Sequence, residues 1–314
     1  MKLLKFSRPA AFLLAALSAN RAYPNAVGDL WAHDNLVAWC TVPFDAKMRG
    51  PEERAQMLEK LGFKHFAYDW RAKDIPTFDA EIGALKEHGI DLLAWWFPFD
   101  ADDPQAKATL ETFKRHNVHP QLWVIHSLAS VSKSLNSHFP KNAEEQELHV
   151  AREANRIAAL ARLAEPYGCS VELYNHNGWF GMEENQLAII ERLKALGATD
   201  VGMVYNFSHA RDDLHDDSKN FPQLWKTMKP HVVAVNITGM HWDGKEVYPS
   251  QGDSELAMMR TIQKSGWKGP IGLIAEKGGD AEITLGNYII GLDWLAAELK
   301  QPGSGGPRPF PLVQ

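Results

Sequence analysis

The stretch from Ser170 to Phe180 reads SVELYNHNGWF and decides the fold class. It begins as a short apolar run, which indicates a buried strand, and it ends in polar residues and a glycine. A longer segment with helical spacing precedes it, from Ala143 to Ala164, and another follows it, from Glu183 to Leu196. The stretch is therefore one strand between two helices, with its polar residues at the end where the strand stops.

The same alternation extends over the rest of the chain. The expected strands are 36–44, 65–70, 91–97, 121–126, 170–176, 201–207, 232–238 and 271–276. The expected helices are 51–61, 77–87, 104–116, 143–164, 183–196, 221–228, 254–264 and 281–300. Strands that are each followed by a helix predict the α/β class and a single-domain (β/α)8 TIM barrel. An open doubly wound sheet is the alternative, and it is disfavoured because no glycine-rich phosphate loop follows the first strand.

The two ends of the chain differ from this pattern. Residues 1–22 combine positive charges at Lys2, Lys5 and Arg8 with a short apolar run and small residues, which predicts a signal peptide and an exported, periplasmic or secreted protein. The barrel is expected over residues 23–300, and the Pro/Gly-rich residues 301–314 are expected to form a flexible tail. No later stretch is long and apolar enough to predict a stable membrane insertion.

Composition narrows the class of partner. The chain has 314 residues and a formal net charge of -6, with acidic and basic residues mixed along its length. No basic run or stripe is present, so a nucleic-acid partner is not expected. The cysteines, Cys40 and Cys169, fall in or beside expected strands and are interpreted as small buried residues, with a disulfide as the alternative.

Catalytic residues of such a barrel lie at the C-terminal ends of its strands. Polar side chains gather at these ends: Asp69, His126, Glu172, Asn175, His176, Asn206, His209, Asn236, His241, Glu276 and Lys277. An isolated histidine is more often a core residue, but six strands that end this way indicate a site. Trp95 and Trp179 also lie near strand ends, where an aromatic face can stack on a sugar ring or simply pack in the core.

With these residues the chain resembles the xylose isomerase-like sugar phosphate isomerase/epimerase family. The resemblance covers residues 36–299, and its closest echoes are residues 172–181, 205–210, 235–240 and 251–253. This fold hosts isomerases, epimerases, dehydratases, endonucleases and lyases, so the resemblance predicts the fold more strongly than the reaction.

The resemblance also implies a divalent metal, held in the family by Glu, Asp, His and Glu from four successive strands. Glu172, Asn206, Asn236 and Glu276 occupy these positions here. Amide oxygens bind hard cations but carry no charge, so Mg²⁺, Mn²⁺ or Ca²⁺ is expected rather than Zn²⁺.

The activity that this implies is a sugar isomerase or epimerase that abstracts a proton next to a carbonyl. Glu172, Glu276 and His209 are the expected catalytic residues. The expected sugar-binding residues are His126, Asn175, His176, Trp179, Trp95, Lys277, His241 and Asp69. Because export is expected, the partner is a free or keto sugar, and a homo-oligomer is compatible with this interpretation. Two alternatives stay open: a lyase that cleaves an oxidised (keto) glycoside, and a non-catalytic carbohydrate-binding barrel.

Overall fold

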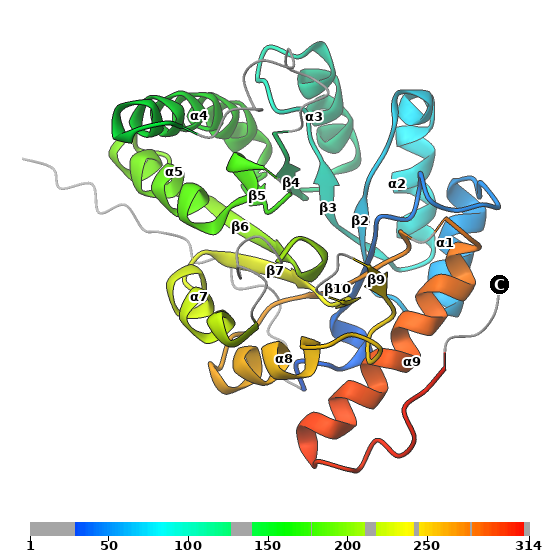
Figure 1. Ribbon diagram of the computed structural model, residues 1–314. Coiled ribbons are helices and arrows are strands. Elements are labelled where there is room, and N and C mark those ends of the chain that lie inside the picture. The colour runs from blue at the N-terminus through cyan, green and yellow to red at the C-terminus, as the bar shows by residue number, and fades with distance from the viewer. Residues whose placement is uncertain are drawn as a thin grey trace, which may run out of the picture.

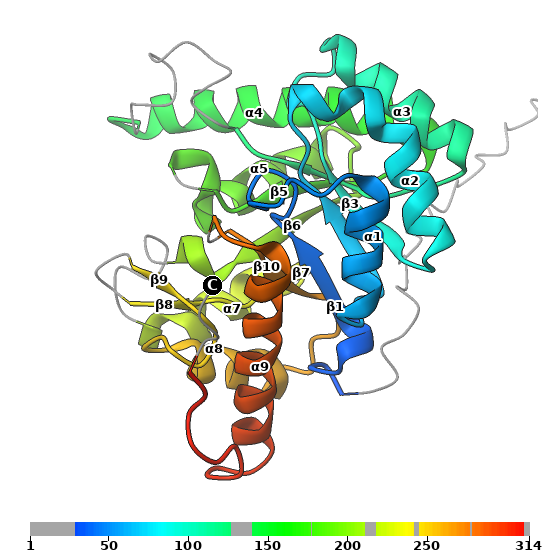
Figure 2. The ribbon, with the colours of Figure 1, turned by 90° about the vertical axis from the view of Figure 1, so that its right-hand side faces the viewer.

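The computed structural model describes residues 29–126, 140–176, 178–210, 218–241, 245–276 and 278–310. Within these residues, eight parallel strands close into a barrel in the order β1-β10-β7-β6-β5-β4-β3-β2. Helices surround the barrel in chain order, from α1 to α9 (Figures 1 and 2). The predicted single-domain TIM barrel is confirmed. The expected signal peptide at residues 1–22 lies outside the described residues.

Most elements begin and end close to the expected positions, but the strand expected over 36–44 ends at Trp39, because Cys40 adopts a left-handed conformation with φ 49°. The barrel strands are β1 (Leu36–Trp39), β2 (His65–Tyr68), β3 (Asp91–Trp96), β4 (Gln121–Val124), β5 (Val171–Tyr174), β6 (Val201–Asn206), β7 (Val232–Asn236) and β10 (Ile271–Ile274). The α-helices are α1 (Pro51–Lys60), α2 (Phe78–Glu87), α3 (Pro104–His116), α4 (Ala143–Ala164), α5 (Glu183–Ala195), α7 (Phe221–Met228), α8 (Glu255–Lys264) and α9 (Ala281–Lys300).

Register decides which strand residues face the inside of the barrel. Trp39 of β1 and Trp123 of β4 lie on strands that are not neighbours, yet their ring centroids are 4.5 Å apart, so both rings lie inside. Glu172 of β5 is aligned with Trp123, and Gly202 of β6 is aligned with Glu172. Aligned residues of neighbouring strands share a face, so Glu172 and Gly202 also face the interior.

Local chemistry explains where the helices begin and end. The carboxylate of Asp103 accepts the N–H of Gln105 at the start of α3, and the side chain of Asn142 accepts the N–H of Glu145 at the start of α4. Gly197 follows α5 with φ 78°, a left-handed conformation that costs glycine little.

A buried ion-pair network joins the first βα unit to the last helix. The Arg49 guanidinium lies 2.8 Å from Asp45 in its own loop and 2.8 Å from Asp280 at the start of α9. Lys60 of α1 also pairs with Glu282 of α9, and the two helices lie side by side in Figure 1. These contacts hold the seam where the barrel closes.

A short antiparallel hairpin, β8 (Gly239–Met240) and β9 (Glu246–Val247), follows β7 and was not expected from the sequence. Within the residues expected to form a flexible tail, Gly303 and Gly305 donate their N–H groups to Glu298 of α9. Cys40 and Cys169 are both buried free thiols. Among the described helices, none combines the length and the hydropathy needed to cross a membrane.

Candidate functional site

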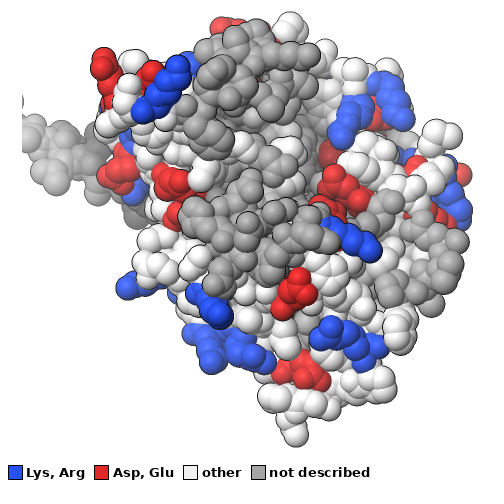
Figure 3. Space-filling model, in the orientation of Figure 1, with Lys and Arg blue, Asp and Glu red and all other residues white. Residues whose placement is uncertain are grey.

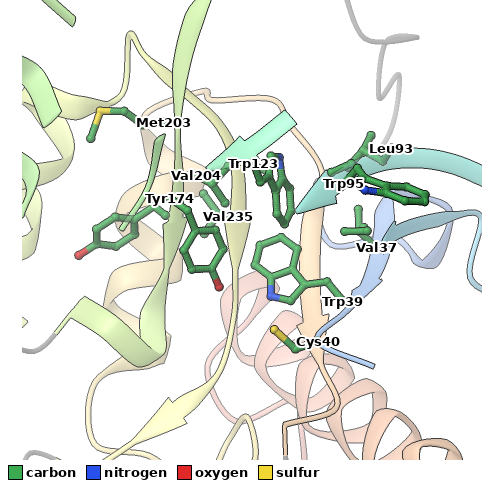
Figure 4. Close-up of a cluster of buried hydrophobic side chains, with 14 of the residues drawn as sticks. Val37, Trp39, Cys40, Leu93, Trp95, Trp123, Tyr174, Met203, Val204 and Val235 are labelled. Atoms are coloured by element: carbon green, nitrogen blue, oxygen red, sulfur yellow. The ribbon is translucent and has the colours of Figure 1, made fainter. Parts of the chain in front are cut away.

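Four aromatic side chains fill the upper interior of the barrel, and we call them the aromatic floor: Trp39, Trp96, Trp123 and Tyr174. The Trp96 centroid lies 4.9 Å from Trp123 and 5.6 Å from Tyr174. Three of the four are buried, whereas Trp96 is half-buried. Figure 4 shows Trp39, Trp123 and Tyr174 together inside the barrel. Trp96 is therefore the member of the floor with ring surface left for a ligand.

Trp95 does not belong to this floor, although it was expected to bind sugar. Its ring packs against Phe78 of α2 at 4.7 Å and against Phe113 of α3 at 5.0 Å. The side chain therefore lies between the sheet and the helices, on the opposite face of β3 from Trp96. Strand alternation puts neighbouring residues on opposite faces, so the aromatic candidate in β3 is Trp96.

Glu172 lies deeper than expected. It precedes Tyr174 by two residues on the same face of β5, and it is aligned with Trp123 of β4. A Cβ atom on Gly202 would lie 2.4 Å from Glu172 Oε2 and 2.9 Å from the carbonyl oxygen of His231, which precedes β7. The carboxylate thus lies towards the N-terminal ends of β6 and β7, whereas Glu276 follows β10 at the C-terminal end. The structure does not bring Glu172 and Glu276 to one mouth.

Asp69, and not Glu172, supplies a buried carboxyl group at the mouth of the barrel. It follows β2 and is 2% exposed. Its Oδ1 accepts the N–H groups of Thr41 at 3.2 Å and Val42 at 3.1 Å, from the loop after β1. Its Oδ2 is buried and has no hydrogen-bond partner among the residues that the structure describes. The loop after β1 therefore holds one of the two carboxyl oxygens in place.

Burial raises the pKa of Asp69 to about 7, although the Val42 and Thr41 N–H groups and nearby Arg71 favour the carboxylate. A carboxyl group in this range can take up or release a proton near neutral pH. The sequence predicts Asp69 as a sugar-binding residue. Its burial and its raised pKa also suit it to act as an acid or a base.

Further acidic groups surround the mouth. Burial raises the pKa of the Cys40 thiol well above its usual value, and the charges of Asp69, Glu276 and Glu246 raise it further. Cys40 lies at the end of β1, between the ends of β2 and β10 in the barrel order. Glu246 belongs to β9, an element that the sequence analysis did not anticipate. Glu276 follows β10 at the same end of the barrel, and its role in the site stays a prediction.

Asn206 organises the end of β6. Its Nδ2 donates to the Tyr174 hydroxyl oxygen at 2.7 Å, and its Oδ1 accepts from the backbone N–H and the hydroxyl of Ser208. Asn175 holds the Asn206 backbone on both sides, accepting its N–H at 2.7 Å and donating to its carbonyl at 3.1 Å. Because the Tyr174 oxygen accepts from Asn206, its own O–H remains available to donate to a ligand.

His176 and His209 form a pair beside Tyr174, with ring centroids 4.6 Å apart. Burial, together with the neighbouring His176, lowers the pKa of His209 to about 3. Burial also lowers the pKa of His176. His209 is consequently neutral at neutral pH, so each of its expected roles has to be played by an uncharged imidazole.

Two other expected sugar-binding residues contact α4. The His126 ring stacks on Phe99 at 4.6 Å, and its Nδ1 lies 3.3 Å from Glu153 on α4. Trp179 donates from Nε1 to Gln146 of α4 at 2.8 Å and is 7% exposed. The structure therefore uses His126 and Trp179 to pack the helical layer.

His241 lies at the hairpin that β8 and β9 form. Its Nδ1 is 3.1 Å from a carboxylate oxygen of Asp253, and both side chains are partly exposed. It therefore lies at the rim, not on the aromatic floor. Lys277 lies outside the described residues.

The expected metal ligands do not converge. Asn206 Oδ1 already accepts two hydrogen bonds from Ser208. Asn236 donates from Nδ2 to the Gly272 carbonyl, and its Oδ1 has no hydrogen-bond partner within the described ranges. The Glu172 carboxylate lies beside Gly202, near the N-terminal ends of β6 and β7. In the described part of the chain, no three His, Cys, Asp or Glu side chains are grouped so as to hold an ion. The expected set therefore does not fit a metal in this arrangement.

Comparison with solved structures places the barrel among known folds. The 3-keto-D-glucoside 4-epimerase YcjR of E. coli matches with a TM-score of 0.59 and 14% identity, over 83% of this chain and 98% of that chain. D-psicose 3-epimerase from Clostridium cellulolyticum H10, solved with D-tagatose, gives 0.57 and 14%, over 84% and 98%. A xylose isomerase-like TIM barrel protein from Mycobacterium smegmatis in complex with magnesium gives 0.56 and 13%, over 88% and 99%.

The chain has the xylose isomerase-like barrel fold. No family model matches it, and no curated protein matches its sequence. At these identities the likeness shows the fold of this xylose isomerase-like barrel and not its substrate. The neighbours include sugar epimerases and a magnesium complex, whereas the present barrel shows no metal site of its own among its described residues.

Proposed function

We propose that this chain is an enzyme that isomerises or epimerises a free or keto sugar by moving a proton at a carbon next to a carbonyl. The observation that carries the proposal is the Asp69 carboxyl group. It is buried at the mouth and held through one oxygen, its other oxygen has no hydrogen-bond partner in the described part of the chain, and its pKa is raised to about 7. Such a group is suited to accept a proton and to give it back at neutral pH.

In the first step, Asp69 Oδ2 removes the proton, and the electrons of the C–H bond move into the carbonyl to give an enediolate. The new negative charge lies on the former carbonyl oxygen and needs hydrogen-bond donors. Tyr174 can supply its O–H because its oxygen already accepts from Asn206. Burial raises the pKa of Tyr174 well above its usual value, which keeps this donor protonated.

In the second step, the enediolate takes a proton and the carbonyl forms again. Return of the proton to the same carbon from the opposite face gives the epimer, and protonation of the neighbouring carbon gives the isomer. We assign the second proton transfer to Glu276, which follows β10, the strand that adjoins β1 in the barrel order. Asp69 and Glu276 thus replace the pair expected from the sequence.

Recognition of a sugar is supported by the aromatic floor. Trp96 offers a partly exposed ring beside Trp123 and Tyr174, and aromatic faces pack well against the C–H faces of sugar rings. The expectation of export, from residues 1–22, is part of the proposal and favours an unphosphorylated substrate. Acidic and basic side chains are interspersed over the described part of the face in Figure 3, so no single-sign patch appears there.

Solvent exchange tests the proposal directly. The full chain is incubated in D2O with a panel of 3-keto-glucosides and ketohexoses, and deuterium at carbons next to the carbonyl is measured by mass spectrometry and NMR. We expect exchange with the wild-type chain and at least a hundredfold slower exchange with Asp69→Asn. Glu183→Gln is the matched control, because Glu183 is also a buried carboxyl group with a raised pKa, but it lies on α5.

The same experiment separates the alternatives. Loss of a leaving group together with exchange identifies the lyase that cleaves a keto glycoside. Sugar binding in calorimetry without exchange on any substrate identifies a non-catalytic barrel, an outcome that the aromatic floor alone would also support. Equal exchange rates in the wild-type chain and in Asp69→Asn remove Asp69 from the mechanism.

A further inference from the structure

We propose that Cys40 is a positioning residue whose left-handed backbone aims two backbone N–H groups at Asp69, and that its thiol is not required for this. The role of Asp69 in catalysis rests on the proposed function, but the arrangement itself does not. From the sequence, Cys40 was interpreted as a small buried residue, with a disulfide as the alternative.

The backbone of Cys40 has φ 49°, which few residues other than glycine adopt. Directly after it, Thr41 and Val42 both donate their N–H groups to the same oxygen, Asp69 Oδ1, at 3.2 and 3.1 Å. Successive N–H groups that converge after a left-handed residue form a concave anion-binding nest. In this barrel the nest in the loop after β1 binds the carboxylate of Asp69, which follows the neighbouring strand β2.

The turn is held from both sides. Ala275 donates its N–H to the Trp39 carbonyl at 3.2 Å, so β10 fixes the residue before Cys40. Phe44 and Asp45 both donate their N–H groups to the Thr41 carbonyl, so the following residues are fixed as well. Between these anchors, the direction of the Thr41 and Val42 N–H groups depends on the φ of Cys40.

Several groups act on the Asp69 carboxyl from the surrounding elements. The Thr41 and Val42 N–H groups come from the β1 loop, and Arg71 follows Asp69 in the chain; all three favour the carboxylate. The charges of Asp69 and Glu276 also raise the pKa of Cys40 and the pKa of Tyr174. Figure 4 shows the Cys40 sulfur beside the Trp39 indole. The nest is the part of this environment that Cys40 controls.

Loss of the nest has a defined consequence. Two N–H donors stabilise the charged form of Asp69, so turning them away makes the proton harder to remove. A tenfold change in the protonation equilibrium corresponds to about one pH unit. We therefore expect the titration midpoint of Asp69 to rise by about one pH unit when the left-handed turn is lost.

The test uses the full chain, labelled with ¹³C at aspartate carboxyl carbons, with Asp69→Asn identifying the Asp69 signal. Cys40→Gly keeps the left-handed turn without a thiol, whereas Cys40→Val disfavours it through β-branching. Met48→Val is the matched control, because Met48 has the same φ of 49° but is 77% exposed in the same loop. Carboxyl shifts are followed from pH 4 to 9, and amide exchange of Thr41 and Val42 is measured in parallel.

We expect the midpoint to stay near 7 in Cys40→Gly and Met48→Val and to rise in Cys40→Val, with faster exchange of both amides. An unchanged midpoint in Cys40→Val overturns the proposal, and so does an equal rise in Cys40→Gly, which would assign the effect to the thiol. If Cys40→Val does not fold, Cys40→Thr carries the same β-branching and the same criteria. No substrate is needed, so the result stands apart from the success or failure of the sugar assay.

Discussion

Replacing Asp69 with asparagine is expected to remove activity and, above neutral pH, to make the protein more stable. The folded-state pKa is about 7, against an ordinary value of 3.8. Between these two pH values the unfolded chain binds fewer protons than the folded chain, so the free energy of unfolding falls as pH rises. At 1.36 kcal/mol per pH unit, the full loss above pH 7 is roughly 4 kcal/mol.

Asparagine carries no charge and avoids this loss. Its side-chain oxygen can still accept the N–H groups of Thr41 and Val42, as Asp69 Oδ1 does. Its Nδ2 takes the place of the unpartnered Oδ2 and becomes an unsatisfied buried donor, which costs about 1–3 kcal/mol. The net expectation is a gain of about 1–3 kcal/mol at pH 8 and a loss of similar size at pH 4.

Thermal unfolding at pH 5 and pH 8 measures both terms. For a chain of this size, 1 kcal/mol changes Tm by about 2–4 °C, so Asp69→Asn should melt several degrees above the wild-type chain at pH 8. Asp45→Asn is the control of opposite sign. Hydrogen bonds from Ala281 and Arg49 outweigh the effect of burial and lower the pKa of Asp45. The stability that its charged form contributes is fully present above the ordinary pKa of 3.8, so its replacement should cost the same stability at pH 5 and at pH 8.

The reasoning is refuted if Asp69→Asn is less stable than the wild-type chain at pH 8, or if the difference between them does not change with pH. Either result would mean that the Asp69 carboxyl group is not forced to keep its proton by burial. Its assignment as a group that titrates near neutrality would then fail, whatever the sugar assay shows.

Three further outcomes follow from the site and the core. Trp96→Ala should raise KM for sugar at least tenfold. Trp95→Ala should leave KM unchanged and lower the free energy of unfolding by about 3–5 kcal/mol. The opposite result would mean that Trp95 faces the barrel interior and Trp96 faces the helices. Gly202→Ala should cost about 1–3 kcal/mol in urea denaturation, because its Cβ would lie 2.4 Å from Glu172 Oε2. The His209 imidazole should stay neutral at pH 5 in NMR titration, since burial and His176 lower its pKa to about 3; a charged ring there would contradict this.

The order and type of the elements could be predicted from the sequence with little error. The expected helices over 104–116, 143–164 and 281–300 have the bounds of α3, α4 and α9. The expected strand over 91–97 is β3 with one residue fewer. These features depend on local signals, namely apolar periodicity and glycine or proline at helix ends, and such signals act within a few residues.

The site was only partly predictable. Asp69 and Glu276 were recognised because polar residues directly after buried strands mark the mouth of a barrel. Trp95 was chosen over Trp96 because a strand that is apolar on both faces gives no sign of which residue points inward. Glu172 was expected at the mouth because it belongs to a strand that ends in polar residues. Its height in the barrel depends on the register of β5 against β6, which the local sequence does not encode.

The chain by itself thus determined an eight-fold alternation of strand and helix, because each element is stabilised by residues close to one another in sequence. Only the closed barrel decided that Glu172 lies beside Gly202, that Trp96 faces inward, and that the loop after β1 supplies two N–H groups to Asp69. These facts depend on distances between residues far apart in the chain. Such distances are set by how neighbouring strands are aligned and how the barrel closes, not by any one segment.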